Sequence, residues 1–305
     1  MIATPVEGLT AAMRMRREHP LRATLAIAEQ ALRAGDLATR DLWCVDADRS
    51  CGEAAARMAA LGFDLAPLDE RPLRRFVVRA DLERADPGSR VGGAARPIDA
   101  MHMVTIDLGL ADTLELLAER DFLFVIEGGA VSGLITLADL QRVPVGMMTL
   151  AIILATEVGL NELILRYYGR DDFLEHLSDD RRREALERYQ QLKRRNLEAS
   201  PIDVLSLDDR LRLVCKVTRF RRELGFTSRR RFESWAEKLK RLRDSLAHGR
   251  MILDHETDAG RALALVRKVR LFAEKVWDLA EEPGGGRNRS PNERAPGPSG
   301  TAIVR

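Results

Sequence analysis

Arg243 and His248 carry the side chains of this sequence whose types and spacing favour a chemical reaction. They are the first and last residues of the run RDSLAH. Arginine keeps its charge and can hold a phosphate group through two N–H donors, whereas histidine can take and give a proton near pH 7. The pair predicts metal-free cleavage of RNA, in which His248 is the general base on a ribose 2′-OH and Arg243 stabilises the phosphoryl oxygens. Asp244 would orient His248, and an ion pair with a neighbouring arginine explains Asp244 equally well.

The same residues also have a structural interpretation. Gly249 follows His248 where a basic helix is expected to end, and a glycine there, with a cation near the helix C-terminus, makes a favourable cap. The helix carries further basic residues that would follow an RNA backbone or simply form a solvated face: Arg229, Arg230, Arg231, Lys238 and Lys240. The other histidines have no partner pattern, and we assign them no role: His19, His102, His176 and His255.

The elements that must position this pair are helices. From about residue 145 onward, apolar residues recur at helical spacing and no strand signal is present. We expect one helix from the apolar stretch through Tyr167, a second capped by Ser178, a third over residues 208 to 224, a fourth after Ser228 and a last one capped by Thr257. The fourth helix would bury Phe232, Trp235, Leu239 and Leu242. The pattern predicts an up-and-down bundle of about five helices.

Two segments of this helical region resemble the HEPN family, a helical bundle often found in prokaryotic nucleases and defence proteins. They are IDVLSLDDRLRLVCK and LGFTSRRRFESWAEKLKRLRDSLAHG. The shared features are an arginine followed by a polar residue, a histidine four to six residues on, and the ending Leu-Ala-His-Gly; here the spacing is four, and Asp244 stands where Asn is more frequent. The resemblance implies a HEPN-like bundle over residues 144 to 282, a metal-independent ribonuclease, a homodimer in which two motifs meet across a two-fold axis, and a role in prokaryotic defence or stress response.

The N-terminal half contains an internal repeat. Residues 55 to 81 and residues 113 to 139 both read as helix, strand, turn, strand and aspartate, and the two aspartates, Asp81 and Asp139, lie 58 residues apart. The second copy has Gly128-Gly129 at its turn, which suits a hairpin. Short helical segments alternate with β-branched runs between about residues 36 and 143, and this alternation predicts a mixed α/β unit.

The second copy resembles the CBS domain at the run GLITLAD, residues 133 to 139. The resemblance implies a tandem CBS pair over residues 21 to 143 that can hold an adenine nucleotide, with Thr136 touching phosphate and Asp139 bonding the ribose hydroxyls. The first copy has Arg75 and Val78 where the pattern has Gly and Thr, and only Asp81 is retained. The alternative for both aspartates is that they N-cap their helices.

Length and composition exclude other classes of protein. The 305 residues, 45% of them hydrophobic, can form two domains with their own cores. The cysteines, Cys44, Cys51 and Cys215, are too few for a disulfide framework and lack metal-ligand spacing, so we expect a cytoplasmic protein with no metal site. The N-terminus lacks the apolar core of a secretory signal. The longest uncharged stretch, residues 143 to 156, is shorter than the roughly 20 residues that span a bilayer and predicts a buried helix, with no membrane as partner.

The fold class expected from these patterns is α+β and multidomain: an N-terminal CBS-pair α/β module followed by an all-α helical bundle. Residues 1 to 20 and 283 to 305 are expected to be flexible or disordered. The predicted function is RNA cleavage regulated by an adenine nucleotide, with no cofactor for catalysis. The alternative is a non-enzymatic, nucleotide-sensing protein whose bundle serves dimerisation or partner binding, and a purely structural oligomer ranks last because it leaves the spacing of Arg243 and His248 unexplained.

Overall fold

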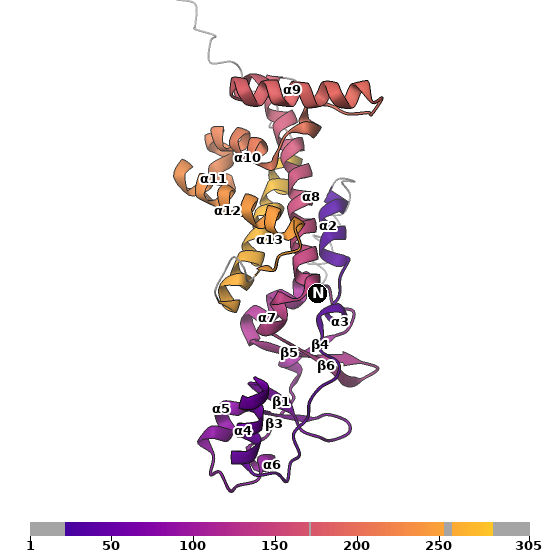
Figure 1. Cartoon of the computed structure of the whole chain (residues 1–305), viewed down its shortest axis with the longest axis vertical. Helices are drawn as coiled ribbons and strands as arrows, with labels where there is room; N and C mark the ends of the chain where they lie inside the picture. Colours follow the sequence, from indigo (N-terminus) through magenta and orange to yellow (C-terminus); the bar gives the residue numbers. More distant parts are fainter. Residues whose placement is uncertain (1–21, 171, 253–257, 283–305) are drawn as a thin grey trace, which may run out of the picture. The chain divides into compact units, whose positions relative to one another are not determined.

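The computed structural model describes residues 22 to 170, 172 to 252 and 258 to 282 (Figure 1). The segments expected to be flexible, the cap Thr257, and His19 and His255 lie outside the described residues. Contacts group the chain into two units, one of Met1–Thr156 with Glu237–Glu274 and the other of Glu157–Ala236 with Lys275–Arg305. The divisions fall inside three long helices. The domain boundary expected between residues 143 and 144 therefore stays a prediction.

The first unit contains the α/β elements. They are α2 (Arg22–Gln30), α3 (Ala34–Leu37), α4 (Cys51–Leu61), β1 (Leu65–Pro67), β2 (Arg75–Val78), α5 (Arg79–Arg84), α6 (Val91–Ala94), β3 (Arg96–Pro97), η1 (Ala100–His102), β4 (Met103–Thr105), α7 (Leu110–Arg120), β5 (Phe122–Glu127), β6 (Ala130–Thr136) and η2 (Leu137–Gln141). The strands form two three-stranded sheets, β1-β2-β3 and β4-β5-β6.

The structure confirms the internal repeat. The first copy runs α4, β1, β2, α5 and the second runs α7, β5, β6, η2. Both long helices have 11 residues and end in a left-handed residue, Gly62 (φ 73°) in the first copy and Asp121 (φ 61°) in the second. The antiparallel hairpins correspond in the two copies, but their registers differ by one residue: Leu65 faces Val78 in the first copy, whereas Phe122, and not Leu123, faces Thr136 in the second.

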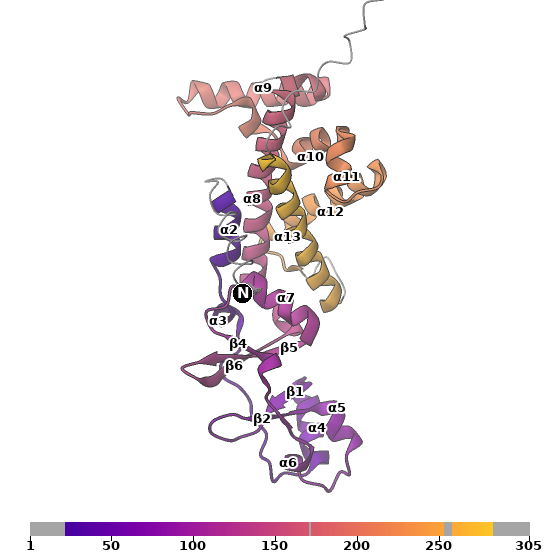
Figure 2. The same ribbon diagram turned by 180° about the vertical axis from the view of Figure 1, so that it is seen from behind.

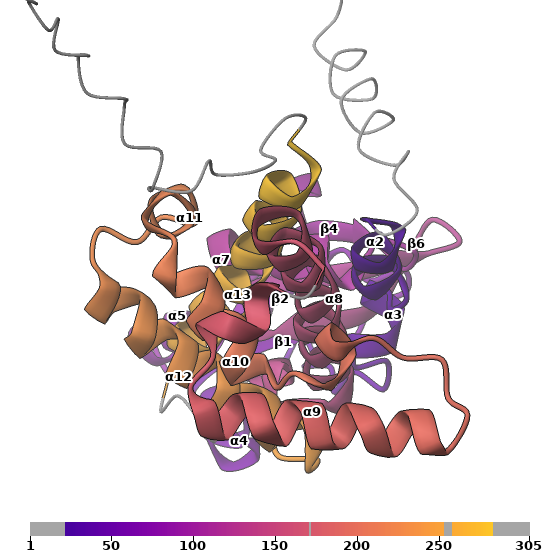
Figure 3. The ribbon, with the colours of Figure 1, turned by 90° about the horizontal axis from the view of Figure 1, so that it is seen from above.

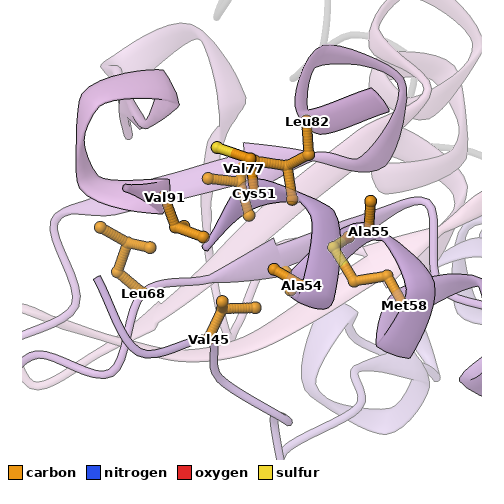
Figure 4. Close-up of a cluster of buried hydrophobic side chains, with 10 residues drawn as sticks. Val45, Cys51, Ala54, Ala55, Met58, Leu68, Val77, Leu82 and Val91 are labelled. Carbon is orange, nitrogen blue, oxygen red and sulfur yellow. The ribbon is translucent and has the colours of Figure 1, made fainter. Parts of the chain in front are cut away.

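Each repeat also has a parallel strand contact before its long helix. In the second copy β4 pairs in parallel with β5, and α7 covers that sheet (Figure 2). In the first copy Val45 forms a single parallel bridge to Leu68. The first copy closes over its own small core, drawn in Figure 4, in which α4 contributes Cys51, Ala54 and Met58 and the neighbouring strands contribute Val45 and Val77.

The two repeats exchange strands. β3, which precedes the second copy, pairs with β2 of the first, with Phe76 opposite Arg96. Thr39, which precedes the first copy, pairs with Leu134 of β6 through N–H···O bonds of 2.9 and 3.0 Å. Gly133 allows this approach, because a Cβ there would lie 3.1 Å from the Thr39 carbonyl oxygen. Phe76 of one sheet and Phe124 of the other share a core, with ring centroids 5.6 Å apart.

The apolar stretch begins a long helix that extends through Tyr167, as the sequence predicts. α8 (Val143–Tyr168) has 26 residues, and Pro144 lies in its first turn, where the missing N–H has no helical partner. By length and composition α8 could cross a membrane, but half of its most apolar segment is buried inside the protein, and buried core helices meet the same criteria. The helix predicted from the apolar stretch through Tyr167 is confirmed, and it is longer than the uncharged stretch from which no membrane span was expected.

The described residues from 143 to 282 are entirely helical outside turns, as the sequence predicts. α9 (Asp179–Arg194) follows Ser178 and is seen along its length in Figure 3, and α12 (Arg229–Ala247) buries its four predicted residues. The predicted third helix is two, α10 (Leu207–Lys216) and α11 (Thr218–Glu223), because Val217 is extended. The other elements of this region are η3 (Asp172–His176), η4 (Pro201–Val204) and α13 (Ala259–Glu281). Asp258 accepts hydrogen bonds from the first turn of α13, where Thr257 was expected to cap.

In the second unit, one buried carboxylate joins α9 to α10. Asp209, 3% exposed, accepts two hydrogen bonds from the Arg181 guanidinium at 2.8 and 2.6 Å and one from the Ser206 hydroxyl at 2.7 Å. Burial raises the pKa of Asp209, but the hydrogen bonds from Arg181 and Ser206 outweigh burial, so the pKa lies below its ordinary value.

Candidate functional site

The turn between β6 and η2 brings Thr136 and Asp139 together. Thr136 is the last residue of β6 and the capping residue of η2. The Asp139 carboxylate, which is 7% exposed, accepts the Thr136 backbone N–H at 2.7 Å and its hydroxyl at 3.2 Å through the same oxygen, Oδ2. The alternative that Asp139 itself caps the helix is wrong: Thr136 occupies the cap, and Asp139 is the third residue of η2, from which it binds back to the cap.

Arg142 occupies the other oxygen of this carboxylate. Its Nε lies 2.9 Å from Asp139 Oδ1, its Nη1 donates to the Leu37 carbonyl at 2.8 Å, and its Nη2 donates to the Thr39 hydroxyl at 2.6 Å. Leu37 ends α3, which packs beside β6 (Figures 1 and 2). Thr39 is the exchanged residue paired with Leu134. One arginine therefore links the aspartate of the second repeat to the segment that enters from ahead of the first. We call these contacts the Arg142 bridge.

The first repeat places Asp81 at the equivalent position with different surroundings. Val78 is the capping residue of α5, and Asp81 is again third in its helix, so the alternative of an N-cap is wrong here too. Asp81 pairs with Arg84 at 2.6 Å and with Arg96 of the exchanged strand β3. No contact among the described residues joins Asp81 to Thr136 or Asp139. The first repeat thus keeps the aspartate but has no hydroxyl beside it.

Both aspartates are therefore tied to an exchanged segment by an arginine, which the sequence analysis missed. Arg84 and Arg142 each follow their aspartate by three residues, the spacing at which helical neighbours form ion pairs. This spacing was visible in the sequence. Arg96 and Thr39 had no such signal, because they reach the site through strand exchange between segments that are distant along the chain.

The residues predicted to be catalytic lie at the end of α12, in the same unit as the two repeats. The helix ends at Ala247, and Gly249 (φ 74°) is left-handed, so the structural cap expected at this glycine is present. Asp244 pairs with Arg243 at 2.9 Å, which is one of the two alternatives left open for it. The His248 side chain is exposed, and no hydrogen bond or ion pair reaches it from the described residues.

α13 connects this helical region to the second repeat within the first unit. Arg270 of α13 binds Glu29 of α2 at 2.8 Å and Asp112 of α7 at 3.2 Å, and Arg267 binds Glu115 of α7 at 2.7 Å. Burial lowers the pKa of Arg270, but Glu29 and the other carboxylates raise it by more, so its charge is secure. α13 therefore docks on α2 and α7 through charged contacts.

The hydroxyl of Thr136 and the carboxylate of Asp139 could bind a nucleotide if the carboxylate were released from Arg142. A carboxylate suits the two hydroxyls of a ribose, and a threonine hydroxyl can donate to a phosphate oxygen. Both Asp139 oxygens already accept protein donors, Oδ2 from Thr136 and Oδ1 from Arg142. Because the Asp139 side chain is only 9% exposed, a ribose hydroxyl that binds Oδ1 would have to take the place of the Arg142 guanidinium there.

Comparison with known proteins gives structural likenesses over about a third of the chain. No protein-family model and no curated protein sequence matches it. An uncharacterized conserved protein from Pyrococcus horikoshii is 19% identical, with 36% of this chain and 90% of that chain covered and a TM-score of 0.32. The CBS domain of a bacterial CNNM/CorC family Mg2+ transporter in complex with ATP is 15% identical over 42% and 94%, with a TM-score of 0.33. CBSX2 in complex with AMP is 22% identical over 35% and 92%, with a TM-score of 0.31.

Proposed function

We propose that the two α/β repeats form a CBS-like pair that binds an adenine nucleotide, and that the protein is a nucleotide-sensing regulator. The observation that carries the proposal is the turn at Thr136 and Asp139, which holds a hydroxyl and a carboxylate together beside the exchanged residue Thr39. The first repeat, with Val78 in place of the threonine, has no such pair. We therefore propose one nucleotide per chain, in the second repeat.

In the bound state Asp139 would accept the ribose hydroxyls and Thr136 would donate to a phosphate oxygen. Asp139 supports this role because the Thr136 N–H at 2.7 Å holds its Oδ2, while the Thr136 hydroxyl would turn from Oδ2 to the phosphate and Arg142 would leave Oδ1. Asp81 was also predicted to bind nucleotide. Its carboxylate is bound to Arg84 and Arg96, and without a hydroxyl at Val78 we assign it to holding β3.

Titration calorimetry with AMP, ADP and ATP tests this function. Thr136→Val gives the second repeat the residue that the first repeat has, keeps the shape of the side chain and removes the hydroxyl. It should weaken binding about tenfold, the value of one hydrogen bond to a charged group. The matched control is Thr105→Val, which removes an exposed hydroxyl from β4 and should bind like the wild type. The proposal fails if the wild type binds none of the three nucleotides, or if both variants bind alike.

A second candidate function is the metal-independent cleavage of RNA. The observation that favours it is the exposed imidazole of His248 close in sequence to Arg243, whose guanidinium is 37% exposed and oriented by Asp244. In this proposal His248 removes the proton of a ribose 2′-OH, Arg243 stabilises the phosphoryl oxygens, and the product carries a cyclic phosphate. One such pair is a sparse site, so the active form would be a symmetric homodimer that joins two of them.

Incubation of the purified protein with total RNA and with tRNA in EDTA tests this second function. His248→Ala and Arg243→Ala should each abolish cleavage, and a substrate with a 2′-deoxyribose at the cut should be inert. Arg241→Ala is the control, because Arg241 lies on the same helix, is exposed and, among the described residues, contacts Glu237 alone, through its carboxylate at 3.9 Å and its carbonyl at 3.4 Å. If His248→Ala still cleaves, or if the wild type leaves every RNA intact, the nucleotide-sensing function stands without an enzyme.

A further inference from the structure

Arg142 has a position that no other side chain of the site shares. It is the residue directly before α8, and its guanidinium contacts three separate segments: it forms an ion pair with Asp139 of η2 and hydrogen bonds to Leu37 at the end of α3 and to the exchanged residue Thr39. Leu37 and Thr39 are more than 100 residues away along the chain. The side chain of Arg142 is nevertheless 41% exposed, so it can leave these partners without repacking a core.

A nucleotide and the Arg142 bridge compete for the same oxygen. Asp139 Oδ2 accepts the Thr136 N–H and hydroxyl, and Oδ1 is the oxygen that contacts Arg142. A guanidinium holds several acceptors best when its planar donors all fit at once. Loss of the Nε contact therefore weakens the two remaining bonds to Leu37 and Thr39, which share the same rigid group.

We propose that Arg142 is a gate on the nucleotide site: it closes Asp139 in the empty protein, and a bound nucleotide displaces it and releases the exchanged segment. This proposal rests on the proposed nucleotide-binding function and adds its regulation. Arg142 is a positioning residue here, since it acts through Asp139 and Thr39. When a nucleotide is bound, the backbone pairing of Thr39 with Leu134 is weaker, and Arg142, the residue before α8, no longer contacts Asp139.

The first repeat provides an internal contrast. There the exchanged strand carries its own arginine, Arg96, which pairs directly with Asp81, and Arg84 pairs with Asp81 separately. Arg84 lies on α5 itself, so Arg96 alone ties Asp81 to β3. β3 is also paired with β2 at two positions, whereas the backbone of Thr39 is held at a single bridge to Leu134, so the second repeat is the one whose exchanged segment opens more readily.

Affinity for ADP, measured by calorimetry, tests the competition. Arg142→Met keeps the aliphatic chain and removes every donor, so it should bind ADP up to about fivefold more tightly than the wild type, because the nucleotide no longer displaces a partly exposed ion pair. Arg142→Lys, with a single ammonium in place of the planar fork, should lie between them. Arg57→Met, at an exposed α4 arginine with no ion pair among the described residues, controls for the loss of charge. Equal or weaker binding by Arg142→Met overturns the gate.

Hydrogen exchange of the empty proteins, followed by mass spectrometry, separates this proposal from the function on which it rests. Arg142→Met should exchange the amides of Thr39 and Leu134 faster than the wild type, and Arg57→Met should not. ADP added to the wild type should give the same increase. No change in Arg142→Met refutes the gate whatever the protein binds. A change in Arg142→Met, with no nucleotide bound by either protein, refutes the nucleotide function and leaves the Arg142 bridge as a structural contact only.

Discussion

Replacement of Asp139 by alanine tests whether this carboxylate holds the second repeat together in the absence of ligand. The substitution removes the acceptor of the Thr136 N–H, a capping interaction worth about 1 kcal/mol. It also removes the Arg142 ion pair, which contributes at most about 1 kcal/mol because Arg142 is 41% exposed. We therefore expect Asp139→Ala to lower the free energy of unfolding by about 2 kcal/mol.

Urea denaturation followed by circular dichroism at pH 7 measures this loss. The control is Asp41→Ala, since Asp41 is exposed and has no hydrogen bond or ion pair among the described residues. It should change the stability by less than about 0.5 kcal/mol. A cost of Asp139→Ala within that range would show that the carboxylate is not needed for the fold, and the bonding described for the turn would then be an incorrect account of it.

Two further predictions concern single contacts. Because hydrogen bonds hold the pKa of Asp209 below its ordinary value, its contribution is complete above about pH 4 and is lost as the pH falls through the folded-state pKa. Asp209→Asn should therefore cost about 2 kcal/mol at pH 7, discounted for the 37% exposure of Arg181, and the gap to the wild type should narrow in denaturation series below pH 4. Gly133→Ala places a Cβ 3.1 Å from Ala38 Cβ and should lower the melting temperature through a loss of about 1 kcal/mol; an unchanged melting temperature would show that the exchanged segment can shift.

The sequence predicts the local elements of this protein well. The order of helix, strand, turn and strand predicted for the two repeats is found in the structure, because helix, turn and strand signals act over short distances, although the strand registers differ by one residue. The aspartates were harder to assign. A sequence alone does not distinguish an aspartate at the N-cap from one at the third helical position. The structure distinguishes them, because Thr136 and Val78 are the capping residues.

The features that the sequence does not predict are those made by distant segments. β3 has two residues and the pairing of Thr39 is a single bridge, so neither contains a hydrophobic period to recognise. The candidate catalytic pair was located correctly at a helix end, but the chemistry of Arg243 and His248 depends on groups opposite them, which the spacing of two residues does not specify.

Strand exchange also has a consequence for how the chain is made. During synthesis the first repeat leaves the ribosome long before Leu134 does. The backbone of Thr39 is therefore unpaired until the second repeat is made, whereas β2 can pair with β3 earlier, because β3 lies closer to it along the chain. A chain that stops between the two repeats would carry an unpaired backbone segment able to associate with other chains. We therefore expect that neither repeat folds when the other is deleted, and that the two repeats form one folding unit.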